Sequence, residues 1–208
     1  MVSEALISAF VTLFVVIDPI GVAPLFISLT PSETVAHRRR LALKGVGIAA
    51  ATLFVFGLFG EMLLQALGVG MPAFRIAGGI LLVLLSIDML MARDSGLRNT
   101  TDGEAAEGVK RDDISVFPLA IPLIAGPGSM TSIVLLMGKA EGDPAMLGAI
   151  LATLAVVLLV SLLCLLAARS LMKLLGVTGV NVITRVFGII TAALGVQFVI
   201  DGVLVVLG

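Results

Sequence analysis

The sequence predicts an all-α, polytopic membrane protein with six transmembrane helices arranged as two inverted-topology three-helix repeats. Three observations support this fold class: an apolar composition, six apolar stretches of membrane-spanning length, and a Pro/Gly break in each half. Of the 208 residues, 59% are hydrophobic and 13% are charged, and the mean hydropathy is +1.20. A soluble domain carries about 25% charged residues, so the expected surroundings of this chain are lipid.

Six apolar stretches follow one another along the chain. Each reaches the roughly 20 residues that a helix needs to cross about 30 Å of hydrocarbon. They cover residues 4–30, 41–66, 72–92, 114–138, 144–171 and 180–207. A polar stretch rich in Gly, Thr, Asp and Glu, which is typical of a flexible linker, separates the third from the fourth. We therefore expect a first repeat over residues 1–92, a cytoplasmic linker over 93–113 and a second repeat over 114–208.

The first apolar stretch contains the break Asp18-Pro19. At 1.5 Å per residue, the pieces on either side would form helices of only about 20 and 18 Å, so the break is expected near mid-membrane. Asp followed by Pro is a favourable helix start, with Asp as N-cap and Pro at the first helical position. A carboxylate at that depth costs about 2.5–3.5 kcal/mol. Asp18 is therefore a candidate binding group, with helix capping as the alternative role.

The fourth stretch has a similar break without a carboxylate. Gly126-Pro127 follows Asp18-Pro19 by 108 positions, and the same offset carries Gly68 onto Gly176. Three prolines within ten residues would disrupt a continuous helix here, so the first and fourth helices are both expected to be broken near mid-membrane. With three spans per half, the second half enters the membrane from the opposite side, which predicts an inverted repeat.

The two breaks differ in charge, and this difference suggests a ligand. The first offers a carboxylate, whereas the second offers free amides and the positive end of a helix dipole, which attract anions. A small zwitterion fits this pair, with its ammonium toward the first break and its carboxylate toward the second. Two hydroxyl donors extend the second break. The expected substrate-binding residues are Asp18, Pro19, Gly21, Gly126, Pro127, Gly128, Ser129 and Thr131.

The last span contributes further polar residues. Asn181 and Arg185 are four positions apart and share a helix face, so we consider them candidates for gating or for orienting the substrate. Snorkelling of Arg185 to the membrane interface is the alternative. Thr184 and Gln197 are other polar residues of this span that are candidates to point inward.

The distribution of basic residues predicts the orientation. If the amino terminus is outside, eleven of the thirteen lysines and arginines fall on the inner side, and only Arg75 and Lys139 fall outside. This positive-inside asymmetry predicts that both termini are outside. The basic segment 37–40 at the start of the second span is expected to contact lipid headgroups.

The sequence lacks the motifs of soluble enzymes. Walker and dinucleotide-binding glycine patterns and the His-Glu-x-x-His metal motif are absent. The single cysteine, Cys164, allows no internal disulfide and no cysteine-cluster metal site. We expect no enzymatic activity, no cofactor, no metal and no nucleic acid partner. The expected partners are the lipid bilayer and a small zwitterionic substrate, and a homo-oligomer stays open.

Three separated motifs resemble the MarC family of bacterial and archaeal membrane proteins, which includes small neutral amino acid transporters. They lie at residues 18–26 (DPIGVAPLF), at residues 117–129 (FPLAIPLIAGPGS) and in the last span, residues 181–185, 197–198 and 201–202. The resemblance implies discontinuous first and fourth helices in two inverted repeats. It also implies a multi-pass protein of the cytoplasmic (inner) membrane of a prokaryote. Its implied function is secondary active transport of glycine-, alanine- and serine-class amino acids, coupled to protons or sodium.

Two other functions stay open. One is an exporter or a passive channel for another small metabolite, although no span carries the charged ring or open polar stripe of a channel. The other is a membrane scaffold in which the breaks serve only helix packing. The mid-membrane carboxylate of Asp18 is costly for a scaffold. The direction of transport, uptake or export, also stays open.

Overall fold

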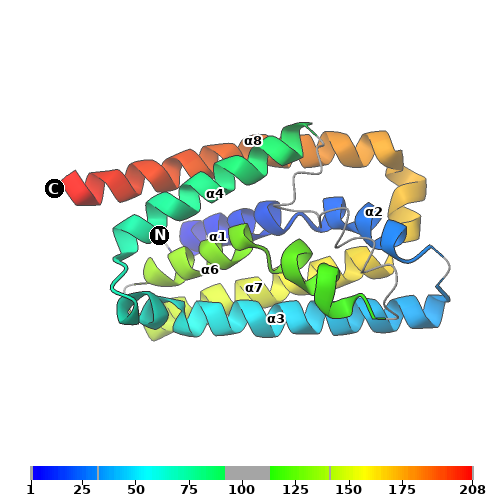
Figure 1. The fold of residues 1–208 in the computed structure, drawn as a ribbon, viewed down its shortest axis with the longest axis horizontal. Coiled ribbons are helices and arrows are strands. Elements are labelled where there is room, and N and C mark those ends of the chain that lie inside the picture. Colours follow the sequence, from blue (N-terminus) through cyan, green and yellow to red (C-terminus); the bar gives the residue numbers. More distant parts are fainter. Residues whose placement is uncertain (1, 32, 92–112, 141, 208) are drawn as a thin grey trace.

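Every element that the structure describes is a helix (Figure 1). The structure is a computed structural model and describes residues 2–31, 33–91, 113–140 and 142–207. The linker predicted over residues 93–113 falls outside this part of the chain, except for Asp113. The elements are α1 (Val2–Ile17), α2 (Pro19–Leu29), α3 (Val35–Ala66), α4 (Met71–Met91), η1 (Ser115–Ile124), α6 (Pro127–Gly138), α7 (Pro144–Leu166) and α8 (Ala168–Leu207).

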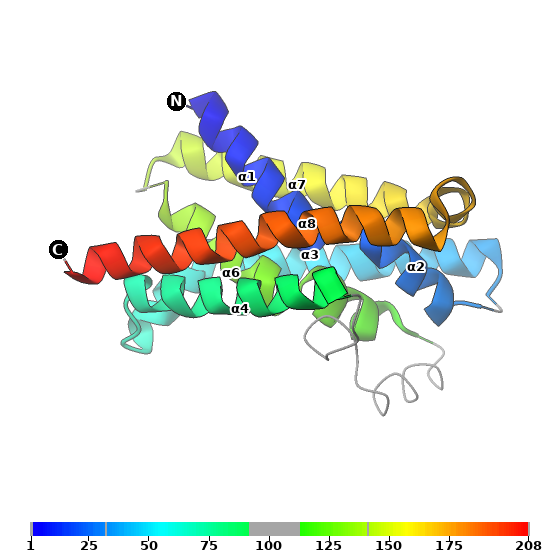
Figure 2. The same ribbon diagram turned by 90° about the horizontal axis from the view of Figure 1, so that it is seen from above.

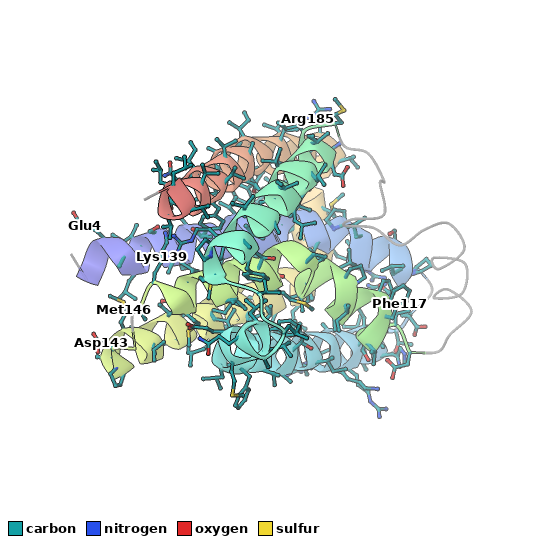
Figure 3. The ribbon with its side chains drawn as sticks, turned by 60° about the vertical axis from the view of Figure 1, so that its left-hand side comes forward. Glu4, Phe117, Lys139, Asp143, Met146 and Arg185 are labelled. Atoms are coloured by element: carbon teal, nitrogen blue, oxygen red, sulfur yellow. The ribbon has the colours of Figure 1, made fainter. Side chains whose placement is uncertain are left out.

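Five helical stretches within the described residues are long and apolar enough to cross a membrane. The first, Glu4–Leu29, combines α1 and α2, and a sixth span results if η1 and α6 form one bent crossing. The start of α1 and the end of α8 lie at the same end of the bundle (Figure 1 and Figure 2). Glu4, Lys139 and Asp143 also lie at that end, and Phe117 lies toward the other (Figure 3). An even number of crossings agrees with this arrangement.

The bundle is apolar on the outside as well as in its core. The larger buried cluster contains side chains such as Leu13, Phe26 and Leu154, which are fully enclosed. Large apolar side chains also cover the outer faces of the long helices, where a soluble protein would place charged residues. They include Val55, Phe59, Leu159, Leu163, Ile189, Val203 and Leu204, each more than a third exposed. A surface of this kind is suited to lipid.

Two predicted span boundaries differ from the structure. The second span was expected from residue 41, but α3 begins at Val35, where Thr34 caps it by accepting a hydrogen bond from the His37 amide at 3.2 Å. The fifth span was expected to reach residue 171, but α7 ends at Leu166. The first turns of α8 instead cross the end of the bundle (Figure 1), and Gly176 then turns the chain into the last span.

The two glycines at the 108-residue offset both have a positive φ. Gly68 has a φ of 71° and Gly176 a φ of 64°, values that glycine adopts without steric cost. The offset found in the sequence therefore coincides with a shared requirement for glycine at these two positions. The inverted relationship between the two halves stays a prediction.

Helices α4 and α8 pack closely along their length (Figure 2) because glycines line their contact. On α8, Gly188, Gly195 and Gly202 recur every seven residues and face α4. A Cβ added at Gly79 would lie 2.5 Å from the carbonyl oxygen of Gly195. The two backbones thus touch directly, and this contact leaves no room for a side chain.

We expect Gly195→Ala to destabilise the protein by about 1–3 kcal/mol, the usual cost of overpacking. The added Cβ would lie 2.7 Å from the Gly79 carbonyl oxygen and 2.9 Å from the Val83 amide nitrogen, and neither backbone atom can rotate away. The control is Gly47→Ala, whose Cβ would meet nothing within 4 Å. Thermal unfolding in detergent, followed by circular dichroism, compares them, and equal stability of the two variants would contradict the prediction.

Arg38 ties the end of α2 to the start of α3. Its side chain is 8% exposed, and its Nε donates a hydrogen bond to Thr30 Oγ1 at 2.9 Å. One terminal nitrogen donates to the Thr30 carbonyl, and the Thr30 hydroxyl donates to the Phe26 carbonyl at 2.7 Å. A positive charge at this place also complements the negative end of the α2 dipole. Arg38 thus turns inward, unlike the lipid contact expected for the basic segment as a whole.

We expect Arg38→Gln to lower the free energy of unfolding by about 1.5–3 kcal/mol, the usual contribution of hydrogen bonds to a charged group. The exposed neighbour Arg40 provides the matched control, because Arg40→Gln removes the same charge without touching Thr30. Surface substitutions usually change stability by less than about 0.5 kcal/mol. Chemical denaturation in detergent measures both, and a loss of stability shared by both variants would indicate a surface-charge effect instead.

Candidate functional site

Asp18 is the most unusual residue of the described chain. It lies between α1 and α2, and it is the only residue other than glycine in the described ranges with a positive φ, 46°. This left-handed backbone costs L-residues about 1–2 kcal/mol, and Asp tolerates it better than most. The side chain is fully buried. Strain and burial of a carboxylate in a candidate membrane span make Asp18 the main candidate for a functional residue.

The carboxylate of Asp18 is held by two elements. Oδ1 accepts a hydrogen bond from the Gly21 amide at 2.9 Å, within the first turn of α2. Oδ2 accepts one from Thr184 Oγ1 at 3.1 Å, across the interface with α8. Next to this contact, the rings of Phe14 and Phe187 pack edge to face with centroids 5.6 Å apart. The site is therefore a contact between the first and last spans.

Gly21 is required by this geometry. A Cβ at position 21 would lie 2.1 Å from Asp18 Oδ2 and 2.8 Å from Thr184 Oγ1. No side chain fits there while the carboxylate keeps its place. Gly21 was expected among the substrate-binding residues, and the atoms closest to the position of its missing Cβ are the oxygens of Asp18 and Thr184.

The interruption at Asp18 is confined to one residue. The Asp18 amide still donates to the Phe14 carbonyl at 2.9 Å, and the Asp18 carbonyl accepts from the Val22 amide at 3.1 Å. Since α1 and α2 also form one candidate span, this break is narrower than the sequence suggested.

The second interruption is wider, and three prolines explain it. A residue before proline is driven to extended backbone, and Phe117, Ile121 and Gly126 all adopt it in front of their prolines. The helical segments η1 and α6 consequently meet at a bend of 57°. No side chain caps the start of α6, so its first amides are presented by backbone alone.

The hydroxyls of the second break are already engaged or packed. Ser129 Oγ donates to the carbonyls of Ile124 at 2.8 Å and Gly126 at 3.0 Å, so this hydroxyl is engaged with the backbone at the bend. Thr131 packs its methyl group against Gly78 of α4, where an added Cβ would come within 1.9 Å. Both side chains are buried, and in this conformation they support the break.

The two interruptions lie next to each other. A Cβ added at Gly128 would lie 3.2 Å from Cγ1 of Val16, two residues before Asp18, and 2.9 Å from Leu85 Cδ2. Val16, Leu85 and the second break also line a cavity of about 20 Å³. That volume suffices for one water molecule and is far below the roughly 300–1,000 Å³ of ordinary ligand pockets. This conformation is closed at the site.

The last span reaches the site through Thr184. Arg185 is exposed and lies at the outer edge of the bundle (Figure 3), and Asn181 is half-buried. From the sequence, Thr184 was only a candidate to point inward and was not among the expected binding residues, whereas the structure places its hydroxyl on the Asp18 carboxylate.

Two more buried hydroxyls lie on α6 and α8, the helices that carry Ser129 and Thr184. Ser132 lies one turn along α6 from Ser129, and Thr191 lies two turns along α8 from Thr184. Neither hydroxyl oxygen has a hydrogen-bond partner among the described residues. An unsatisfied buried polar group costs about 1–3 kcal/mol, so polar atoms are retained here at a cost. The described residues hold no group of three or more His, Cys, Asp or Glu side chains able to bind a metal.

A separate polar contact fixes the beginning of η1 to α3. Asp113 pairs with Lys44, and its Oδ1 accepts a hydrogen bond from the Ser115 amide at 3.0 Å. The hydrogen bond from Lys44, and then that from the Ser115 hydroxyl, lower the pKa of Asp113 to about 2. Because the pKa of Asp113 is lower in the folded protein than in the unfolded chain, this contact stabilises the fold at pH values above the ordinary carboxyl pKa. The stabilisation is lost as the pH falls through about 2. The contact is therefore unaffected by pH in the physiological range.

Comparison with known proteins gives one consistent result. A family model described as MarC family integral membrane protein matches residues 3–207. The chain is 39% identical to a UPF0056 membrane protein of Methanocaldococcus jannaschii over 197 residues, 95% of each chain. It is 34% identical to the UPF0056 membrane protein YhcE of Escherichia coli, covering 93% of this chain and 89% of that protein. No solved structure matches.

Proposed function

The chain belongs to the MarC family of integral membrane proteins, and from this premise we propose that it is a secondary active transporter of small neutral amino acids. The glycine, alanine and serine class is the proposed substrate, driven by a proton or sodium gradient. One observation carries the proposal: the fully buried carboxylate of Asp18 at an interruption within a candidate membrane span. Asp18 also caps α2 by accepting the hydrogen bond of the Gly21 amide, but uncharged Asn or Ser caps a helix as well as Asp does, so capping alone does not require a charge at this depth.

The chemistry of the two helix starts supports a zwitterionic substrate. Asp18 and the Thr184 hydroxyl would receive the ammonium group, since both can accept hydrogen bonds. The start of α6, from Gly126 to Ser129, would receive the carboxylate through backbone amides and the positive end of the helix dipole. Pro19 and Pro127 begin the two helices, and the proximity of Val16 to Gly128 brings the two starts together. We assign Thr131 to the substrate side of α6.

Transport would proceed by alternating access. The 20 Å³ cavity admits no amino acid, so loading requires the two breaks to separate. In our proposal residues 1–92 and 114–208 are inverted-topology repeats, and one moves against the other around the site. Asn181 and Arg185 would act as gating or orienting residues beside Thr184. The proposed location is the cytoplasmic membrane, with both termini outside as the positive-inside rule predicts.

A proteoliposome screen tests this function. Labelled glycine, alanine and serine are offered with and without an imposed pH or sodium gradient, and larger amino acids serve as controls. We expect accumulation above the external concentration only when a gradient is present. Flux that merely equalises concentrations would indicate a channel, and failure of every amino acid in both directions would indicate an exporter or channel for another metabolite.

A further inference from the structure

The start of α3 and the end of α7 lie at the same end of the bundle (Figure 1), and side chains from both, together with Arg169 of α8, line a cavity of about 280 Å³. It is distant in sequence from both breaks and takes no part in the proposed transport. Three of its lining side chains are basic and three are apolar. They are Arg38, Arg39, Arg169, Val35, Leu165 and Leu166.

The basic side chains give this cavity a concentrated positive charge. Arg169, at the beginning of α8, is close enough to Arg38 for their like charges to act on each other. Arg39 and Arg169 are exposed, whereas Arg38 is buried and bonded to Thr30. The negative charge of the Glu33 carboxylate acts on Arg38 in the opposite direction to the positive charge of Arg169. The Glu33 side chain also pairs with His37 at 3.6 Å. Three guanidinium groups in one cavity suit an anion that can accept several hydrogen bonds.

The apolar side chains indicate what carries that anion. Val35 is 73% exposed and Leu166 is 43% exposed, so an exposed apolar surface lies directly beside the arginines. A soluble anion gains nothing from such a surface, whereas an acyl chain buries against it. Basic pockets between helices at the cytoplasmic side of a membrane are suited to anionic headgroups, and this end carries the basic segment expected to face inward.

We propose that this cavity binds the phosphate headgroup of an anionic phospholipid. The phosphate lies between Arg39 and Arg169, and the first part of an acyl chain lies along Val35 and Leu166. Arg38 forms the floor of the cavity, where its bonds to Thr30 hold it in place. The bound lipid offsets the repulsion among the three arginines and joins the start of α3 to the end of α7.

Native mass spectrometry of the full chain in detergent micelles tests this proposal. Dipalmitoyl phosphatidylglycerol is titrated against the wild type, with dipalmitoyl phosphatidylcholine, a zwitterionic lipid of zero net charge, as the comparison. The test variant is Arg39→Gln with Arg169→Gln, two exposed side chains whose removal spares the bonds to Thr30. The matched control is Arg40→Gln with Lys173→Gln, which removes two exposed charges outside the cavity.

We expect the wild type to bind phosphatidylglycerol more tightly than phosphatidylcholine. At about fivefold per basic residue, the test variant loses about 30-fold in affinity for phosphatidylglycerol, and the control changes little. Equal binding of the two lipids by the wild type, or equal losses in the two double variants, would overturn the proposal. A third arm offers inorganic phosphate: if it displaces the lipid at matched concentration, the site takes soluble phosphate and the lipid assignment fails.

Discussion

Asp18→Asn is expected to abolish gradient-driven uptake of glycine and alanine. Asparagine keeps the shape of the side chain and an oxygen for the Gly21 amide, but it removes the negative charge that would hold the substrate ammonium. Removing one partner of a buried ion pair costs about 3–5 kcal/mol, which corresponds to a loss of affinity of about 100-fold or more. Uptake into proteoliposomes and binding by calorimetry both measure this loss.

The fold should survive this change, because a neutral amide is cheaper to bury than a carboxylate. Thermal unfolding of Asp18→Asn is therefore expected at or above the wild-type temperature. The matched control is Asp201→Asn, where the carboxylate instead accepts a hydrogen bond from Gln197 at 2.6 Å near the end of α8, and it should transport normally. An Asp18→Asn protein that keeps wild-type affinity and pH dependence would remove Asp18 from the site.

Gly21→Ala is expected to abolish uptake and to lower stability at the same time. The added Cβ would lie 2.1 Å from Asp18 Oδ2 and 2.8 Å from Thr184 Oγ1, so the carboxylate must leave its position between α2 and α8. Overpacking of this kind costs about 1–3 kcal/mol. The control is Gly148→Ala, where an added Cβ meets nothing within 4 Å. Unfolding temperature and uptake are measured for both variants.

A second substitution separates the two effects of Gly21→Ala. When Asp18→Gly is added, the contact with Oδ2 is removed, and only Thr184 Oγ1, the end of a side chain that can rotate, remains at 2.8 Å. Glycine also adopts the positive φ without strain, so most of the lost stability should recover while uptake stays absent. The second break shares this residue pattern, with Gly126 before the proline and Ser129 three residues later, although Gly126 is extended. Recovery of uptake in the double variant would show that the carboxylate is dispensable.

The helices and the extended residues in front of the prolines were predictable because their causes are local, whereas breaks of the first and fourth helices near mid-membrane stay a prediction. A run of apolar residues long enough to span the lipid bilayer predicts a helix regardless of how that helix packs against its neighbours. Proline restricts the backbone of the residue before it to extended conformations. Phe117, Ile121 and Gly126 are therefore extended because a proline follows each of them. The glycines at 68 and 176 similarly mark sharp turns.

The contacts between helices were not predictable because they depend on how each helix is rotated. Successive residues of a helix differ by about 100° around its axis. One such step separates Thr184, which contacts Asp18, from the exposed Arg185. The sequence indicated that polar residues in this part of the last span were candidates for the site. It could not predict which of them faces Asp18, because that depends on the rotation of α8. Likewise, neither Gly nor Pro marks the end of α7 at Leu166.

The bonds between Arg38 and Thr30 also constrain how the molecule can move. They join the end of α2 to the first turn of α3, so separating these two segments requires breaking the bonds. In the proposed transport cycle, an opening at this end of the bundle would then carry both segments together. The chain would bend at Asp18, the one residue between α1 and α2, so the residue proposed to bind the substrate would also be the hinge.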